Sequence, residues 1–147
     1  MAISTISSLS THYGFRVTCN GDLQTLTEGY IVTFNVISDP TSRCYVTPNT
    51  SSFNTGTYSY TCPVDGYYVF GFKLFINNQP GDNVRMGIYV NDVCLGFGGS
   101  HTSHSEDVTI NCFCNSGDYV YVKCFLGSVS LWRAPLHSWF YGWRLSN

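Results

Sequence analysis

The chain has 147 residues and a formal net charge of −2; 16% of its residues are aromatic and only 11% are charged. The length suits one domain with its own core, and the near-neutral charge gives no electrostatic basis for binding nucleic acid. No stretch is long enough to span a bilayer, so membrane insertion is not expected. A chain so poor in charge is expected to bury part of its surface against copies of itself or a partner.

Short strands separated by turn signals occupy most of the sequence. Residues 1–12 are rich in Ser and Thr and are expected to form a loose lead-in, followed by one domain over residues 13–147. No apolar pattern at helical spacing is present, so the predicted class is all-β. The predicted strands are 13–19, 31–37, a short strand ending at Tyr60, 66–76, 84–90, 93–97, 108–114, 119–126 and 139–145. The main predicted loops are 38–43, 77–82, 98–107 and 128–138, and Asn91-Asp92 is predicted to be a hairpin turn.

The stretch from Gly66 to Ile76 is the most apolar strand. Alternation divides it into two rows, because successive side chains of a strand point to opposite faces. One row is wholly apolar, and the other contains a single charge, Lys73. Both faces of this strand are therefore predicted to be covered. The rows are Tyr68, Phe70, Phe72, Leu74 and Ile76 on one face, and Tyr67, Val69, Gly71, Lys73 and Phe75 on the other.

Seven cysteines are present, and an odd number cannot all pair within one chain. Cys112 and Cys114 share one face of a predicted strand, and Cys124 shares a row with Val120 and Val122. Such positions suit small buried hydrophobic residues. Mostly free thiols are therefore favoured over a secreted disulfide scaffold.

Four blocks of sequence resemble the globular head of the complement C1q family, within the C1q and tumour-necrosis-factor superfamily. The first block contains Phe53, Thr55-Gly56 and the run from Tyr60 to Phe72, which reads YTCPVDGYYVFGF. It is similar to the family signature, in which an aromatic residue is followed by five residues and then by Gly-x-Tyr-x-Phe-x-aromatic. Residues 117–122 resemble the Gly-Asp-x-Val strand opening, 140–145 the closing Phe-x-Gly-Phe-x-Leu strand, and 31–37 the upstream strand.

This resemblance implies a ten-stranded jelly-roll sandwich of two antiparallel sheets that assembles as a homotrimer. In such trimers one sheet packs around the threefold axis, so the row of 66–76 that faces away from the core would be buried between subunits. Tyr67, Val69 and Phe75 are therefore predicted to lie in the trimer interface. The alternative is that both rows lie inside the core of one subunit.

Two metal sites are conceivable. His101-x-x-His104 with Cys112-x-Cys114 offers nitrogen and sulfur ligands for zinc, although buried thiols beside a solvated loop explain the same residues. The family resemblance implies calcium as a possible ligand at the trimer apex, and no cofactor is expected to be required. The candidate calcium ligands are Asp82, Asp92, Glu106 and Asp107, whose spacing matches no signature and also fits ordinary loop acids.

Ligand binding is predicted for two exposed segments. The run from Trp132 to Trp139 combines two indoles with Arg133 and His137, which suits stacking on sugar rings or a protein hot spot. The same indoles would equally serve to seal the end of the barrel or the trimer contact. The loop at 98–107 contributes His101 and His104 as further candidates, since recognition commonly lies on loops held by a rigid scaffold.

These observations predict a homotrimeric recognition head that binds a protein or carbohydrate ligand at a cell, virion or fibre surface. The alternative is a structural trimerisation cap with no ligand of its own. An enzyme is not expected, because the sequence has no nucleophile elbow, phosphate loop or zinc-protease helix. An extracellular, cell-surface or virion-surface location is expected. Residues 1–9 are not expected to be a signal peptide, because they lack a basic start and an apolar run.

Overall fold

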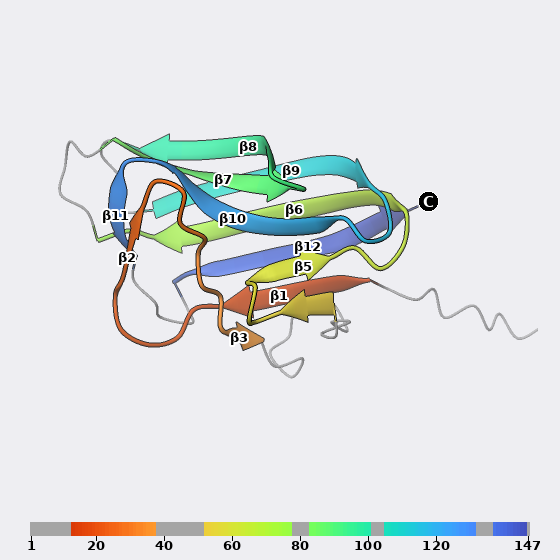
Figure 1. The fold of residues 1–147 in the computed structure, drawn as a ribbon, viewed down its shortest axis with the longest axis horizontal. Coiled ribbons are helices and arrows are strands. Elements are labelled where there is room, and N and C mark those ends of the chain that lie inside the picture. The colour runs from red at the N-terminus through yellow and green to blue at the C-terminus, as the bar shows by residue number, and fades with distance from the viewer. Residues whose placement is uncertain (1–12, 38–51, 78–82, 101–104, 132–136, 147) are drawn as a thin grey trace, which may run out of the picture.

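The computed structural model describes residues 13–37, 52–77, 83–100, 105–131 and 137–146. These ranges contain strands and turns in two antiparallel five-stranded sheets and one short pair of strands (Figure 1). The predicted all-β sandwich is therefore confirmed. Within the described ranges, no helix is both long and apolar enough to cross a membrane. The predicted lead-in at 1–12 lies outside them.

The first sheet has the strand order β3-β1-β12-β6-β9. Its strands are β3 (Val36–Ile37), β1 (Gly14–Thr18), β12 (Trp139–Ser146), β6 (Gly66–Phe75) and β9 (Ser105–Cys114). The predicted central position of β6 is confirmed, because it pairs with β12 on one side and with β9 on the other. Ile76, which was predicted to end this strand, instead forms an isolated bridge with Leu131.

The second sheet has the order β4-β5-β10-β7-β8, and a separate pair of strands closes one end of the sandwich. Its strands are β4 (Phe53–Asn54), β5 (Ser59–Thr61), β10 (Tyr119–Leu126), β7 (Val84–Val90) and β8 (Val93–Ser100). The pair consists of β2 (Gln24–Thr27) and β11 (Ser128–Leu131), which run across the left end of the sandwich in Figure 1. In the described part of the chain, each large sheet has five strands and β2 and β11 form a third, two-stranded sheet, so the predicted count of ten is not confirmed.

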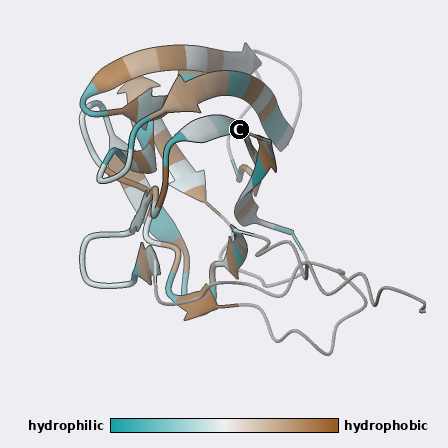
Figure 2. Ribbon diagram, turned by 90° about the vertical axis from the view of Figure 1, so that its right-hand side faces the viewer, coloured by the Kyte–Doolittle hydropathy of each residue, from teal (hydrophilic) through white to brown (hydrophobic). Residues whose placement is uncertain are grey.

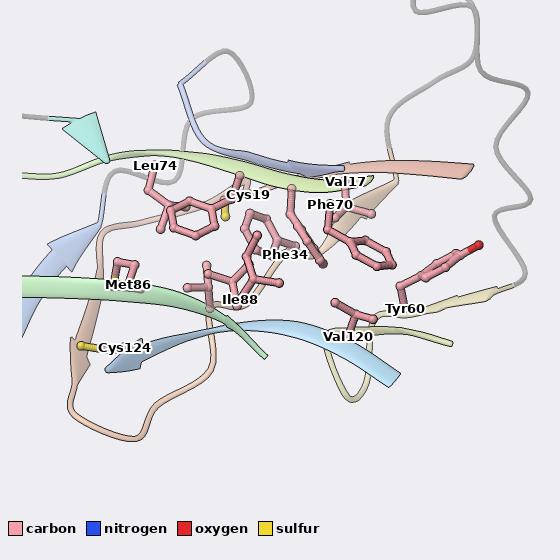
Figure 3. Packing of buried hydrophobic residues seen from close by; sticks show 14 of the residues in the cluster. Val17, Cys19, Phe34, Tyr60, Phe70, Leu74, Met86, Ile88, Val120 and Cys124 are labelled. Carbon is pink, nitrogen blue, oxygen red and sulfur yellow. The ribbon is translucent and has the colours of Figure 1, made fainter. Parts of the chain in front are cut away.

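The core lies between the two sheets and is rich in aromatic residues (Figure 3). The inward row of β6 is buried from Tyr68 to Leu74, and Ile76, which follows the strand, is buried as well. Phe15 of β1 stacks on Tyr60 of β5 with ring centroids 4.3 Å apart, which joins the two sheets directly. Each such large apolar side chain contributes about 1.5–3 kcal/mol when it leaves water. Cys124 is buried in the same row as Val120 and Val122, as predicted.

Several predicted loops contain strands. Residues 98–107 were predicted to be a loop, but β8 extends to Ser100 and β9 begins at Ser105. The several glycines of this segment suggested a loop, but Gly96 and Gly98 are strand residues. They pack so closely on Val108 and Ile110 that a Cβ would overlap those side chains. The predicted loop 128–138 likewise contains β11, whereas the predicted strand 31–37 contains only a bridge at Ile31 and the short β3. β2 and β4 were not predicted.

The Asn91-Asp92 hairpin turn is confirmed. Both residues have positive φ, 47° and 68°, as the two-residue turn between β7 and β8 requires. Its right-handed twist matches that of the flanking strands. Asn and Asp tolerate this backbone region better than most residues, which explains why this dipeptide is found here.

Candidate interaction surface

The outward face of the first sheet carries exposed aromatic and aliphatic side chains on three neighbouring strands. Tyr67 of β6 lies opposite Phe113 of β9, and the two rings meet edge to face with centroids 5.3 Å apart. Both are about half exposed, at 53% and 52%. Val69 lies opposite Trp143 of β12, and Leu145 follows on the same strand at 53% exposure. We call Tyr67, Val69, Phe113, Trp143 and Leu145 the outer patch.

Strand register assembles this patch from residues distant in sequence. Hydrophobic and hydrophilic residues alternate along the long strands (Figure 2), so one row enters the core and the other faces outward. A bulge near the end of β12, between Arg144 and Ser146, brings the outward position of Leu145 next to β6. Contiguous exposed apolar residues are uncommon on monomeric proteins and mark a surface that something covers.

The other end of the same face is polar and cationic. Trp139 of β12 lies opposite Lys73 of β6, which in turn lies opposite Asp107 of β9. The Arg16 guanidinium and the Lys73 ammonium lie 5.2 and 5.6 Å from the centroid of the Trp139 ring. A cation at this distance is attracted by the π electrons of the indole. His137 contacts Phe75 beside this group, with ring centroids 5.4 Å apart.

Tyr141 separates the two ends of this face. Its ring lies across Gly71 of β6, where a Cβ would overlap the tyrosine side chain. Its hydroxyl is 3.1 Å from Oγ1 of Thr109, on the far side of β6, and either oxygen can donate the hydrogen bond. The tyrosine stacks on Trp143 with centroids 5.3 Å apart. Gly71 is thus the position that lets an aromatic side chain lie flat on the sheet.

The outward face of the second sheet is built differently, because its tyrosines bury one another. Tyr119, Tyr121 and Tyr89 stack in sequence, and Nζ of Lys123 lies 4.0 Å from the Tyr89 ring centroid. The hydroxyls of Tyr119 and Tyr121 both donate to the Asp92 carboxylate, at 2.7 and 2.5 Å. These hydrogen bonds, from Tyr121 first and Tyr119 second, lower the pKa of Asp92. The Asp92 carboxylate is therefore engaged in hydrogen bonds with these two tyrosines.

The predicted interface residues all lie on the outward face of the first sheet, but at different exposures. Tyr67 is exposed, whereas Val69 and Phe75 are half-buried. Their outward direction argues against the alternative that both rows of β6 fill the core of one subunit. Whether a second subunit covers them stays a prediction.

The predicted ligand-binding residues are only partly described. His137 is exposed and Trp139 is half-buried at the polar end of the outward face. The remaining candidates, Trp132, Arg133, His101 and His104, lie outside the described residues, so the binding prediction stays untested for them. Sequence reasoning missed Arg16 and Lys73 as neighbours of Trp139, because only strand pairing brings β1, β6 and β12 together.

The described candidate metal ligands do not converge. Asp92 lies in the turn between β7 and β8, whereas Glu106 and Asp107 begin β9 at the opposite end of the sandwich. Glu106 and Asp107 are strand residues rather than loop acids, and Glu106 points inward with only 3% exposure. Asp82 lies outside the described ranges. In the described part of the chain, no group of three His, Cys, Asp or Glu residues is arranged to hold a metal ion.

The cysteines of the zinc hypothesis face the core. Cys114 is fully buried, Cys112 is half-buried, and their Sγ atoms are 3.7 Å apart. They lie at the end of β9. His101 and His104 lie outside the described residues, so a shared zinc site stays a hypothesis. The six described cysteines are all free thiols, as predicted, and Cys44 lies outside the described residues.

Comparison with known proteins identifies the fold. No family model and no curated protein sequence matches the chain. Among solved structures, the tumour-necrosis-factor protein Eiger of S. frugiperda superposes with a TM-score of 0.75 at 13% identity, over 93% of this chain and 94% of that one. The globular domain of zebrafish complement 1qA gives 0.65 at 21% identity, over 91% and 98%. Murine APRIL gives 0.61 at 9% identity, over 91% and 99%.

The chain therefore has the jelly-roll fold of C1q and tumour-necrosis-factor globular domains. The resemblance predicted from the run between Tyr60 and Phe72 is confirmed at the level of the fold. At 9–21% identity these likenesses concern architecture, and assembly and ligands are separate questions.

Proposed function

We propose that the chain is a non-enzymatic recognition head that assembles as a homotrimer and binds a protein or glycan ligand at a cell, virion or fibre surface. The observation that carries the proposal is the outer patch. Three of its residues, Tyr67, Phe113 and Leu145, are more than half exposed although they lie on three neighbouring strands of one sheet. Burying such a surface between subunits is the ordinary way to remove it from water.

A threefold assembly needs a second, different patch on each subunit, because its contacts are heterologous. The second sheet offers one. Val93, Leu95 and Phe97 of β8 are exposed, and Phe97 stacks on the exposed Phe125 of β10 with centroids 5.3 Å apart. Because Gly96 and Gly98 pack β8 against β9, these residues lie at the edge next to the first sheet. The outer patch of one subunit would meet this edge patch of the next.

Ligand recognition would then belong to the segments that flank these contacts. The indole of Trp139, with its two cations and with His137 nearby, is the described part of the predicted binding segment. Indole and guanidinium groups are frequent at binding hot spots. Three copies on one axis would give avidity for a repeated surface ligand.

A screen of the trimer against glycan and cell-surface protein panels tests recognition. Binding that is lost in Trp139→Ala or Trp132→Ala, while the particle mass stays that of a trimer, is the expected result. Tyr30→Ala, an exposed residue outside the outer patch, the edge patch and the tryptophan segment, serves as the surface control for binding. A trimer with no ligand across broad panels would contradict recognition and favour the structural cap.

A further inference from the structure

Three thiols meet at one end of the core, and the mechanism of recognition uses none of them. Cys62 follows β5 of the second sheet, whereas Cys112 and Cys114 end β9 of the first sheet. The Sγ atoms of Cys112 and Cys114 are 3.7 Å apart, and the Cys114 thiol also shares a hydrogen bond with Cys62. Cys114 is thus in contact with both of the others.

The backbone holds Cys62 and Cys114 in this arrangement. The Cys62 N–H donates to the Asp118 carbonyl at 2.8 Å, and the Gly117 N–H donates to the Cys62 carbonyl at 2.8 Å. The turn that contains Gly117 and Asp118 begins directly after Cys114, and the Asp118 carboxylate fixes it by accepting from the Asn115 N–H at 2.8 Å. Both cysteines are fully buried.

We propose that Cys62 and Cys114 form a disulfide that ties the two sheets together when the folded protein meets a small-molecule disulfide oxidant such as oxidised glutathione. This inference is independent of the proposed function, since it concerns the core rather than the surface patches. The bond would make the sandwich more stable outside a reducing compartment than inside one.

Strand geometry excludes Cys112 and Cys114 as the lasting pair. Residues i and i+2 of a strand point the same way, so their Cβ atoms are about as far apart as their Cα atoms, roughly 6.6 Å. A disulfide requires about 3.8 Å between Cβ atoms. A bond between these two cysteines would be strained, and strained disulfides exchange readily with another thiol. Cys62 belongs to a separate segment and is free of this constraint.

Cys112 instead serves as the entry thiol, because it is the least buried of the three. It attacks one sulfur of oxidised glutathione and releases the first glutathione thiol. Cys114 then attacks the Cys112 sulfur and releases the second. Cys62 attacks Cys114 and returns Cys112 to its thiol form. Each attacking thiol loses a proton and each leaving thiolate gains one, so two protein thiols are oxidised and one glutathione disulfide is reduced to two thiols.

The reaction is expected to be slow near neutral pH. The neighbouring thiol, followed by burial, raises the pKa of Cys112. The hydrogen bond with Cys112 lowers the pKa of Cys114, but the hydrogen bond with Cys62 and then burial raise it, to about 12 overall. Since only the thiolate attacks, the rate should rise by about tenfold per pH unit below these values.

Peptide mapping of the folded protein after incubation with oxidised glutathione, without reduction, tests the proposal. We expect a loss of two thiols, a Cys62–Cys114 peptide pair, and a melting temperature about 10 °C higher than that of the reduced protein. The pair should persist in the control Cys19→Ala, form more slowly in Cys112→Ser, and be absent in Cys62→Ser. Because the wild-type map requires no variant, the test does not depend on how well the variants fold. A disulfide between a different pair of cysteines would overturn the proposal. So would Cys62 and Cys114 that both stay free thiols under conditions that oxidise the denatured chain.

Discussion

Tyr67 and Tyr68 are adjacent residues of one type on one strand, yet their environments are opposite. Tyr68 is fully buried; it stacks on Phe70 with centroids 5.6 Å apart and donates from its hydroxyl to the Val64 carbonyl at 2.8 Å. Tyr67 is 53% exposed, and its described ring partner, Phe113, is itself half exposed. The inward row of β6 is complete within one subunit. The outward row is apolar but is left uncovered by the described residues.

The second sheet shows that an outward aromatic row need not stay exposed. Tyr89 and Tyr121 also point away from the core, but they are only 6% and 4% exposed. The Lys123 ammonium lies over the Tyr89 ring, and the Asp92 carboxylate accepts a hydrogen bond from the Tyr121 hydroxyl. None of the five residues of the outer patch is charged. The contrast supports the proposal that the first sheet meets a partner, whereas Tyr89 and Tyr121 of the second sheet are already covered within one subunit.

The largest expected difference between the two rows is in the cost of truncation. Phe70→Ala should lower the free energy of unfolding by about 3–5 kcal/mol, because it leaves a cavity in a fully buried aromatic cluster. That is a large fraction of the stability of a typical domain, so the variant should be largely unfolded. Tyr67→Ala, compared under conditions where both proteins are monomeric, should cost less than about 1 kcal/mol. Urea denaturation followed by circular dichroism measures both, and equal losses would refute the distinction.

Adding a methyl group sharpens the same contrast. A Cβ at Gly142 would overlap Phe70 and lie 2.8 Å from Phe15, and both of these rings are confined by the core. Gly142→Ala should therefore cost about 1–3 kcal/mol of unfolding free energy. A Cβ at Gly71 would overlap only the far end of the Tyr141 side chain and press on Thr109. Gly71→Ala should be the milder change in thermal denaturation; the reverse order would mean that the outward face is as tightly packed as the core.

Alkaline pH should destabilise the inward row. Burial raises the pKa of Tyr68 from 10.0 to about 12. The unfolded chain therefore loses this proton at lower pH than the folded protein does. The stability from the neutral hydroxyl is complete below pH 10 and is lost as the pH rises towards 12. Urea midpoints measured between pH 9 and 12 should fall less steeply in Tyr68→Phe than in the wild type, and parallel slopes would contradict the assignment.

The smallest expected effect concerns Asp92 on the second sheet. Asp92→Asn should lower the melting temperature by only about 1–3 °C, because the carboxylate is exposed. The hydrogen bond to Asp92 raises the pKa of Tyr119, and burial followed by the second hydrogen bond to Asp92 raises the pKa of Tyr121. The high-pH part of the alkaline absorbance titration of tyrosine should therefore move to lower pH in this variant and stay unchanged in the control Asp107→Asn. An unchanged curve in Asp92→Asn would mean that the Asp92 contacts do not persist in solution.

Much of the fold was predictable because a period of two over long aromatic runs allows few alternatives. The ends of β7 and β10 and the turn at Asn91-Asp92 follow directly from the sequence. The errors lie where glycine replaces larger residues, as in β8, or where a strand is very short, as in β2 and β4. At those positions tertiary packing, rather than local preference, decides the conformation.

The candidate surface was harder to predict than the fold. The outward direction of Tyr67, Val69 and Phe75 follows from alternation, and the structure bears out that direction. Phe113, Trp143 and Leu145 were not predicted as their neighbours, because the order of strands in a sheet is not written in any local pattern. The same limit explains why Glu106 was taken for a loop acid when it points into the sandwich.

The mass of the particle in dilute solution tests the central claim most directly. If the outer patch is a subunit interface, light scattering should give about 49 kDa, three times the chain mass of 16.4 kDa. Val69→Asp should give folded monomers of 16.4 kDa, because a carboxylate would be buried without a partner in the contact. Thr109→Asp, on the same face but outside the patch, is the matched control. It should contain a larger fraction of trimer than Val69→Asp. A wild-type monomer, or a trimer that Val69→Asp leaves intact, would contradict the account.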